Sequence, residues 1–497
     1  MFNAKSDFIV RFSGHSSERH QEPEVLTFKE MLKTRRDQAS KSILIQVDAR
    51  RSCNDLHEYL SSLGEVRIMY HYVNQKNSHY ALVEMADHEQ ASDIIHLANK
   101  SKTGMLTIGQ SGVPYFKTRR IRIRLRNNKE LDDDKVLEAS PYKVPSTSIL
   151  DKNDGTSLSL KMVQLYLQST INDLGYRLRF LTCLQVEAIL KTLDPSIVVL
   201  PFGSSVNGFG NKSGDLDMVA LRDYDYSNEN EMEWSRDTEQ ALIASAYDLI
   251  KRKLPGSEKA AKIPKAKVPL VKYYQKHTSL ECDLSFDRRD SIIMSELLYF
   301  LSSVDARVKP LVFSVRDWAK RMELTSEHPG AWISNFSLTL LVLFFLQREH
   351  DENSSIMLPA WDNFFLERKN LLSNEVYTRL FNKYNEMALK NKLILEELLF
   401  KFFIFFSDFN FKTEGISVRS GEIVKKLGLG TALYIENPLS PDLNVSANVT
   451  LKEVYRIQNS MRNSVEALNS GRTGYQFSVL QPVPIKKRRK KGNKLKL

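Results

Sequence analysis

The sequence predicts an α+β protein of more than one domain, and three observations support this fold class. The chain has 497 residues, which is too many for one ordinary hydrophobic core. Strand-like and helix-like segments are mixed up to about position 290, whereas from Ser291 to about Phe406 the periodicity is almost entirely helical. A stretch at 131–157 that is acidic and then rich in Pro, Ser, Asp and Gly separates two folded regions, as a linker does.

The composition excludes several classes of protein. Hydrophobic residues make up 42% and charged residues 26% of the chain, as in globular proteins. The cysteines, Cys53, Cys183 and Cys282, are far apart and odd in number, which argues against a disulfide framework or a zinc knuckle and favours a reducing compartment. The formal net charge of +11 favours an anionic partner, with nucleic acid ahead of a membrane surface.

Two segments bear on membranes and targeting. The longest apolar run, Phe336 to Leu346, is well short of the roughly 20 residues that a membrane span needs. We therefore predict a buried helix there and no membrane span. Residues 1–40 lack sustained periodicity and predict a flexible leader that ends in a short basic helix around Lys33 to Arg36. The first twenty residues mix basic residues and serines with acidic residues, which leaves a transit peptide open.

A first compact module is predicted at 41–130. Strands and helices follow in the order βαββα, with strands at 42–48, 65–73 and 79–86 and helices at 54–64 and 89–100. This order resembles the βαββαβ fold of RNA-recognition modules. Base stacking on such a sheet needs aromatic side chains, and the strands at 42–48 and 79–86 offer only Tyr80. Two roles stay open for the module: direct base stacking, and docking or dimerisation.

Arginine alternates with isoleucine or leucine within 117–129, as in a strand with one basic face. Such a face either contacts phosphates or only protects an edge strand from pairing with other strands. The alternation does not decide between these roles.

The rest of the chain predicts a mixed sheet with preceding helices at 158–290 and a helical domain at 291–465. The expected segments of the first region are helices within 158–193, with a break near Leu174-Gly175, strands at 196–203, 215–221, 266–274 and 280–286, and a helix at 238–252. The end of the chain, 466–497, is rich in lysine and arginine without a hydrophobic pattern and predicts a disordered tail.

Two aspartates in the stretch GDLDMVAL indicate a metal site. Side chains two apart in a strand point to one face, so Asp215 and Asp217 are presented together while Leu216 and Met218 enter the core. A divalent cation relieves the repulsion between two carboxylates, and oxygen ligands suit Mg²⁺ or Mn²⁺. The alternative is a surface pair without function, because this spacing recurs by chance among 60 acidic residues.

The neighbouring segments favour the metal site. Upstream, Gly203 and Ser204 end an apolar strand in a turn whose N–H and hydroxyl groups can hold phosphate oxygens. Downstream, the strand LECDLSF presents Asp283 on the same face as Glu281. A sheet that brings Asp283 beside the aspartate pair can hold two metal ions, the arrangement used for in-line phosphoryl transfer.

These motifs resemble those of a known family. A Gly-Ser pair, a spacer of ten residues, Asp-x-Asp and a later lone Asp on a strand resemble the signature of the DNA polymerase β-type nucleotidyltransferases, in the branch that adds untemplated nucleotides to RNA 3′ ends. The likeness covers roughly residues 155 to 455. With the module before it and the lysine-rich end after it, the chain is most similar to the mitochondrial poly(A) polymerases. The resemblance implies a polymerase β-like palm at 158–290 and a central helical domain with a nucleotide-recognition loop at 291–465.

The resemblance also implies roles for single residues. Asp215, Asp217 and Asp283 become the catalytic carboxylates and the ligands of two Mg²⁺ or Mn²⁺ ions, with Asp283 close to the primer 3′-OH. Gly203 and Ser204 become contacts of the triphosphate. Glu281 is then a bystander.

Further nucleotide contacts follow from the same likeness. Arg316 and Lys320, which share a helix face at i, i+4, match basic residues that contact the triphosphate; a solvated amphipathic helix is the alternative. Phe336 matches an aromatic ring that stacks on the base beside Asn335, with a core position as the alternative. Asn437 belongs to the nucleotide-recognition loop. Uridine-preferring relatives commonly have His where this chain has Leu443, which favours ATP.

The activity implied is template-independent transfer of AMP from ATP to an RNA 3′-OH with release of pyrophosphate. The resemblance further implies a mitochondrial matrix enzyme that polyadenylates mitochondrial mRNAs and forms a homodimer through the N-terminal module. Two alternatives stay open, a terminal uridylyltransferase and an RNA-binding scaffold with an inactive nucleotidyltransferase core.

Overall fold

The structure is a computed structural model. It describes residues 26–100, 106–107, 114–115, 136–142, 150, 155–222, 234–264, 266, 268–326, 328, 330–350, 355–365, 374–426 and 430–469. The predicted basic strand at 117–129 and the tail from position 470 onward lie outside these ranges. The described residues form two compact units, one from Met1–Val144, Ser169–Ser303 and Leu372–Thr378, the other from Pro145–Gln168, Val304–Leu371 and Arg379–Leu497.

The first unit opens with the N-terminal module, a six-stranded sheet in the order β4-β5-β1-β3-β2-β6. Its strands are β1 (Ser42–Val47), β2 (Val66–Val73), β3 (His79–Met85), β4 (Leu106–Thr107), β5 (Pro114–Tyr115) and β6 (Leu137–Glu138). Two helices, α2 (Ser52–Ser61) and α3 (His88–Lys100), cover one face of the sheet and share a core with Ile43, Ile45 and Val83. The predicted βαββα order is confirmed.

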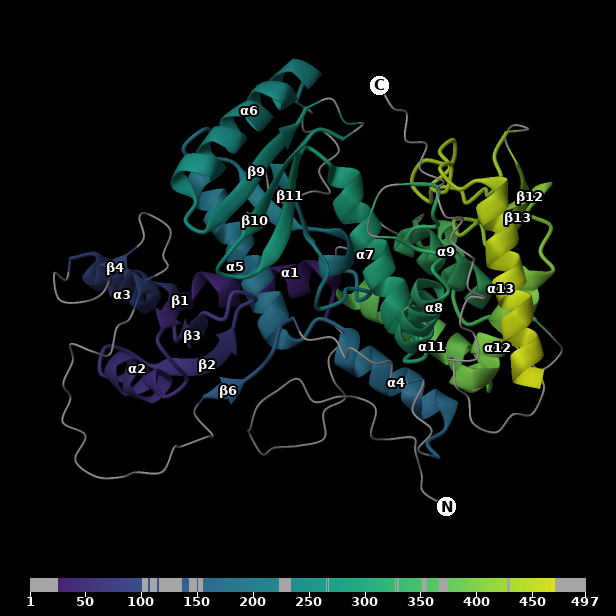
Figure 1. The fold of residues 1–497 in the computed structure, drawn as a ribbon, viewed down its shortest axis with the longest axis horizontal. Helices are drawn as coiled ribbons and strands as arrows, with labels where there is room; N and C mark the ends of the chain where they lie inside the picture. Colours follow the sequence, from purple (N-terminus) through teal and green to yellow (C-terminus); the bar gives the residue numbers. More distant parts are fainter. Residues whose placement is uncertain are drawn as a thin grey trace, which may run out of the picture. The chain divides into compact units, whose positions relative to one another are not determined.

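The other face of this sheet is covered by α1 (Phe28–Ser40) and α5 (Asp173–Leu190) (Figure 1). Tyr72 and Tyr80, on this face, are each only 1% exposed. The Tyr80 hydroxyl lies 2.9 Å from Nδ1 of His277, in the turn after β10 (Leu270–Gln275). RNA-recognition sheets stack bases on the face away from their helices, so Tyr80 is not available for stacking here and this face serves for docking inside the chain.

The predicted helix around Lys33 to Arg36 is confirmed as part of α1, but the prediction that it belongs to a flexible leader is wrong, because α1 packs on the core. Thr27 and Glu30 form a capping box that starts this helix, and Phe28 and Leu32 are fully buried. From the same helix, Nη2 of Arg36 donates to both carboxylate oxygens of Glu187, at 2.9 and 3.1 Å. Within 28–40, apolar side chains recur too sparsely for the sequence to predict a helix that packs on a core.

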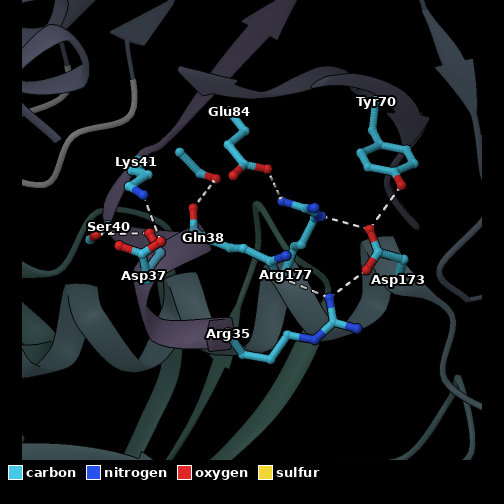
Figure 2. A network of polar contacts seen from close by, with 10 residues as sticks. Arg35, Asp37, Gln38, Ser40, Lys41, Tyr70, Glu84, Asp173 and Arg177 are labelled. Carbon is cyan, nitrogen blue, oxygen red and sulfur yellow. Dashed lines mark hydrogen bonds and ion pairs between the residues drawn. The ribbon is translucent and has the colours of Figure 1, made fainter. Parts of the chain in front are cut away.

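An ion-pair network joins the module to α5 (Figure 2). Arg177 donates to Glu84 of β3 at 2.5 Å and to Asp173 at 2.6 Å. Asp173 also accepts from Arg35 and, at 2.8 Å, from the Tyr70 hydroxyl. The flanking guanidinium groups outweigh burial and lower the pKa of Asp173 to about 2. Arg177 and Glu84 are buried, so module and palm share charged as well as apolar packing.

The palm sheet completes the first unit, with five strands in the order β7-β8-β11-β10-β9. They are β7 (Val198–Pro201), β8 (Leu216–Leu221), β9 (Ser257–Ile263), β10 and β11 (Leu280–Phe286). The pair of β8 and β11 is parallel and the other pairs are antiparallel, which confirms the predicted mixed sheet. The helix α6 (Arg236–Lys253) packs on one face, against a core that includes Leu216, Met218 and Leu284 (Figure 1).

The predicted palm limits of 158–290 differ from the unit boundaries at both ends. The helix α4 (Leu158–Ser169) lies almost entirely in the second unit, whereas α7 (Arg289–Val304) lies in the first up to Ser303. The break between α4 and α5 falls at 170–172, where the Asn172 side chain caps α5. The predicted break is therefore present, but it lies just before Leu174-Gly175, because both residues are in the first turn of α5.

The second unit is mostly helical, as predicted. Its further elements are α8 (Val308–Arg321), α9 (Asn335–Leu346), α10 (Asp362–Phe365), α11 (Asn374–Lys390, whose first turn belongs to the first unit), α12 (Leu395–Ser407), the hairpin β12 (Glu414–Ser417) and β13 (Glu422–Lys425), and α13 (Leu451–Asn469). The apolar run is the helix α9, which is buried from Ser337 to Leu346. No helix in the described ranges combines the length and the apolarity needed to cross a membrane. The helix α13 extends beyond the predicted domain end at 465.

Candidate active site

Three aspartates share one face at the middle of the palm sheet. Asp217 of β8 lies opposite Asp283 of the parallel strand β11, and Asp215 directly precedes β8. The side chains that alternate with them, Leu216 and Met218, are fully buried against α6. The hydrophobic effect therefore fixes which face the carboxylates occupy, because a shift of register by one residue would bury them instead.

The carboxylates repel one another. Burial and the charges of Asp283 and Asp215 raise the pKa of Asp217 to about 6. Burial also raises the pKa of Asp215; Lys272 opposes this rise and Asp283 adds to it. Both carboxyl groups therefore ionise less readily than a free aspartate does.

The donors fit a divalent cation. Oδ1 of Asp283 is buried and has no hydrogen-bond partner among the described residues. Its other oxygen, Oδ2, lies 3.1 Å from Nζ of Lys272. Within the described ranges no three His, Cys, Asp or Glu side chains are arranged to hold a metal ion by themselves. Mg²⁺ commonly takes one or two carboxylates and completes its shell with water and substrate phosphate, so the paired aspartates suit it.

The Gly-Ser turn packs directly on these carboxylates. Gly203 has a φ of +63°, which L residues rarely adopt, and a Cβ there would lie 3.4 Å from Oδ2 of Asp217. Its N–H donates to the Ser295 hydroxyl at 2.7 Å. The predicted phosphate contact of this turn therefore rests chiefly on Ser204, whose side chain is half-buried.

Two basic residues of this site were missed by the sequence analysis. Lys272 on β10 lies opposite Asp283, and Arg179 of α5 is 1% exposed and donates to the carbonyl of Gly214 at 2.7 Å. Arg179 thus holds the residue that precedes Asp215. The only sequence signals are a lysine inside an apolar strand and an arginine inside an apolar helix, and both also occur on ordinary surfaces.

In the second unit, the predicted nucleotide contacts of α8 and α9 meet. Arg316 donates to the Asn335 carbonyl at 3.3 Å and to the Thr339 hydroxyl at 2.5 Å, and burial lowers the pKa of Arg316 to about 10. Lys320, one turn further, is exposed, whereas Phe336 is half-buried. Phe336 is therefore neither a fully buried core residue nor fully solvated.

Asn437 organises a loop of the second unit. Its Oδ1 accepts from the N–H groups of Leu439 and Ser440 at 2.9 and 3.3 Å, and its N–H donates to the Leu443 carbonyl at 2.8 Å. The Leu443 side chain is 44% exposed. These hydrogen bonds fix the backbone of the loop that carries the exposed Leu443 side chain.

Comparison with known proteins assigns the chain to a family. The family model described as "Poly(A) RNA polymerase, mitochondrial-like, central palm domain" matches residues 158–303, the "RL domain" matches 27–99 and the "Cid1 family poly A polymerase" model matches 395–443. The mitochondrial poly(A) RNA polymerase of Drosophila melanogaster is 32% identical, over 89% of this chain and 76% of that protein. The Homo sapiens enzyme is 31% identical, over 88% and 76%.

Solved structures agree with these sequence matches. A crystal structure of mtPAP in complex with ATPγS matches with a TM-score of 0.78 and 27% identity, over 92% of this chain and all (100%) of that chain. The α+β fold and the predicted family are both confirmed. The chain belongs to the mitochondrial poly(A) RNA polymerases.

Proposed function

We propose that the protein adds AMP from ATP to RNA 3′ ends without a template and releases pyrophosphate. The observation that carries this proposal is the register of Asp217 against Asp283, beside the Gly203 turn. The named activity of the relatives, poly(A) RNA polymerase, supports it. We place the activity in mitochondria, in the matrix, with mitochondrial mRNAs as substrates, and a homodimer formed through the N-terminal module remains part of the proposal.

Each residue has a role in this reaction. Asp215, Asp217 and Asp283 would hold two Mg²⁺ or Mn²⁺ ions, which when bound activate the 3′-OH and neutralise the leaving pyrophosphate. Asp283 lies beside the acceptor 3′-OH. Ser204, Arg316 and Lys320 stay proposed contacts of the triphosphate, and Phe336, Asn335 and Asn437 stay proposed contacts of the base. Arg179 and Ser295 keep the loop before Asp215 and the Gly203 turn in place.

The direct test is extension of a labelled RNA oligonucleotide by the purified protein with Mg²⁺ or Mn²⁺, each nucleoside triphosphate being supplied alone. We expect long products with ATP only. Products chiefly with UTP would instead make the chain a uridylyltransferase. The absence of product with every nucleotide would favour an inactive scaffold.

The substitution Leu443→His is expected to shift the preference towards UTP. An imidazole in place of an exposed aliphatic group offers a hydrogen-bond partner to the base edge, and one such contact is worth about 1–3 kcal/mol of discrimination. The ratio of kcat/KM for UTP to that for ATP should therefore rise about 10-fold. Leu443→Met is the matched control, because it adds no hydrogen-bonding group, and it should leave the ratio unchanged. Equal ratios in both variants would remove Leu443 from base selection.

A further inference from the structure

Lys272 of β10 and Lys276, just after this strand, begin a row of lysines that leads away from the carboxylates. Lys272 lies opposite Asp283 of β11, with 3.1 Å between Nζ and Oδ2. Tyr274, two residues on, points to the same face and lies opposite Glu281. Lys276 follows in the turn after the strand. The row therefore starts at the metal site and continues along the carboxylate face of the sheet.

Lysines of two other segments join this row. Nζ of Lys76 and Nζ of Lys259 each lie 5.9 Å from the centroid of the Tyr274 ring. Lys76 also pairs with Glu258 at 2.6 Å. The hydrogen bond from Lys76, with the charges of Lys76, Lys276 and Lys259, lowers the pKa of Glu258. We call Lys76, Lys259, Lys272 and Lys276 the lysine strip.

The N-terminal module supplies one end of the strip and is fixed to the palm there. Nδ2 of Asn74 donates to the Lys276 carbonyl at 3.0 Å, and the N–H of Gln75 donates to the Ser279 hydroxyl at 3.1 Å. Both contacts come from the turn between β2 and β3. They hold Lys76 beside β9 and β10, so the strip is continuous across the two sheets of the first unit.

We propose that the lysine strip binds the phosphates of single-stranded RNA immediately upstream of the 3′ end. This inference rests on the proposed function. Lys272 and Lys276 are four residues apart, so at most about 13 Å of chain separates them, the length of about four stacked nucleotides at 3.4 Å each. The ring of Tyr274 is buried at 9% exposure and offers no platform for a base. Binding through lysine and phosphate alone reads no sequence, which suits an enzyme that accepts each product of its own reaction.

The chain contains a matched control on the opposite face of the same sheet edge. Lys251 and Lys262 flank the Tyr247 ring, at 5.3 and 5.7 Å from its centroid. Lys262 lies opposite Val271, whose side chain enters the core beneath α6. These lysines have the same charge and the same exposed setting, but they face away from the carboxylates.

The experiment compares the double variant Lys76→Gln/Lys259→Gln with Lys251→Gln/Lys262→Gln and with the unaltered chain. Fluorescence anisotropy measures binding of a labelled 15-nucleotide RNA without ATP over a series of salt concentrations. Extension assays measure kcat/KM with ATP for that primer and for a dinucleotide. For the strip variant we expect affinity to fall about 10-fold or more and the slope of log affinity against log salt to decrease by about 1.4. Its kcat/KM should fall much more for the 15-nucleotide primer than for the dinucleotide.

The outcomes separate the two proposals. The control variant should match the unaltered chain in affinity, salt slope and primer ratio. Equal losses in both double variants, or none in either, would overturn the lysine strip, since its position would then not matter. If the unaltered chain adds no AMP to either primer, the proposed function fails, and the anisotropy comparison still decides whether the strip binds RNA.

Discussion

Replacing Asp217 with asparagine is expected to lower kcat for AMP addition by at least about 10³-fold, because the reaction depends on positioned cationic charge that asparagine cannot hold. Asp217 is less exposed than Asp215 and lies opposite Asp283. The matched control is Glu281→Gln, which removes an exposed carboxylate two residues from Asp283 on the same strand. It should retain most of the activity.

The same substitution should make the metal-free protein more stable. The pKa of Asp217 is about 6 in the folded chain, against about 3.9 for an unfolded aspartate. The folded state therefore binds this proton more tightly, and the free energy of unfolding of the unaltered chain falls as the pH rises from about 4 to 6. Above pH 6 the full penalty, on the order of 3 kcal/mol, is present, and asparagine removes it.

Thermal unfolding at pH 7.5, measured with EDTA and with Mg²⁺, tests whether the Asp217 carboxylate lowers the stability of the metal-free protein. In EDTA, Asp217→Asn should unfold at a higher temperature than the unaltered chain. Mg²⁺ should raise the unfolding temperature of the unaltered chain more than that of the variant. A folded variant that still extends primers at the original rate would end the assignment of Asp217 as a metal ligand.

Replacing Arg177 with methionine is expected to destabilise the first unit by about 3–5 kcal/mol, because Glu84 is then left charged and buried and Asp173 loses one of its cations. The lowered pKa of Asp173, about 2, reflects the same dependence on Arg177 and Arg35. The unfolding temperature should fall by about 10 °C. The double variant Glu84→Met/Arg177→Met should regain part of the loss, since both charges of the buried pair are then absent.

The network contains its own control (Figure 2). Asp37 pairs with Lys41 at 2.6 Å, but the Asp37 side chain is 56% exposed. Asp37→Ala should therefore cost less than about 1 kcal/mol. If Arg177→Met and Asp37→Ala lower the unfolding temperature equally, the buried pair does not hold the module on the palm.

Local patterns were enough to predict most elements of the fold. The alternation in GDLDMVAL predicted both the buried residues and the shared face of Asp215 and Asp217. The strand β9 was missed because none of its residues is buried, so it has no hydrophobic alternation to detect. The fold class and the family are confirmed, whereas the roles of the nucleotide contacts stay predictions.

Contacts between distant segments could not be predicted. Arg177 and Glu84 are 93 positions apart, and Tyr80 and His277 are 197 apart. Nothing in the local sequence of either partner indicates the other, because a charged or aromatic residue in a helix or strand is equally compatible with solvent. The docking of the module on the palm, and with it the continuity of the lysine strip, therefore needed coordinates.

The reactivity of the three buried cysteines can report how the first unit opens. Cys53 lies in the core of the N-terminal module, whereas Cys183 and Cys282 lie in the core under α6. All are buried with free thiols, and burial raises the pKa of each thiol. A thiol reagent must therefore wait for an opening event before it reacts. Alkylation rates measured separately for the peptide of each cysteine would distinguish a module that detaches alone from a unit that opens as a whole. No engineered cysteine is needed.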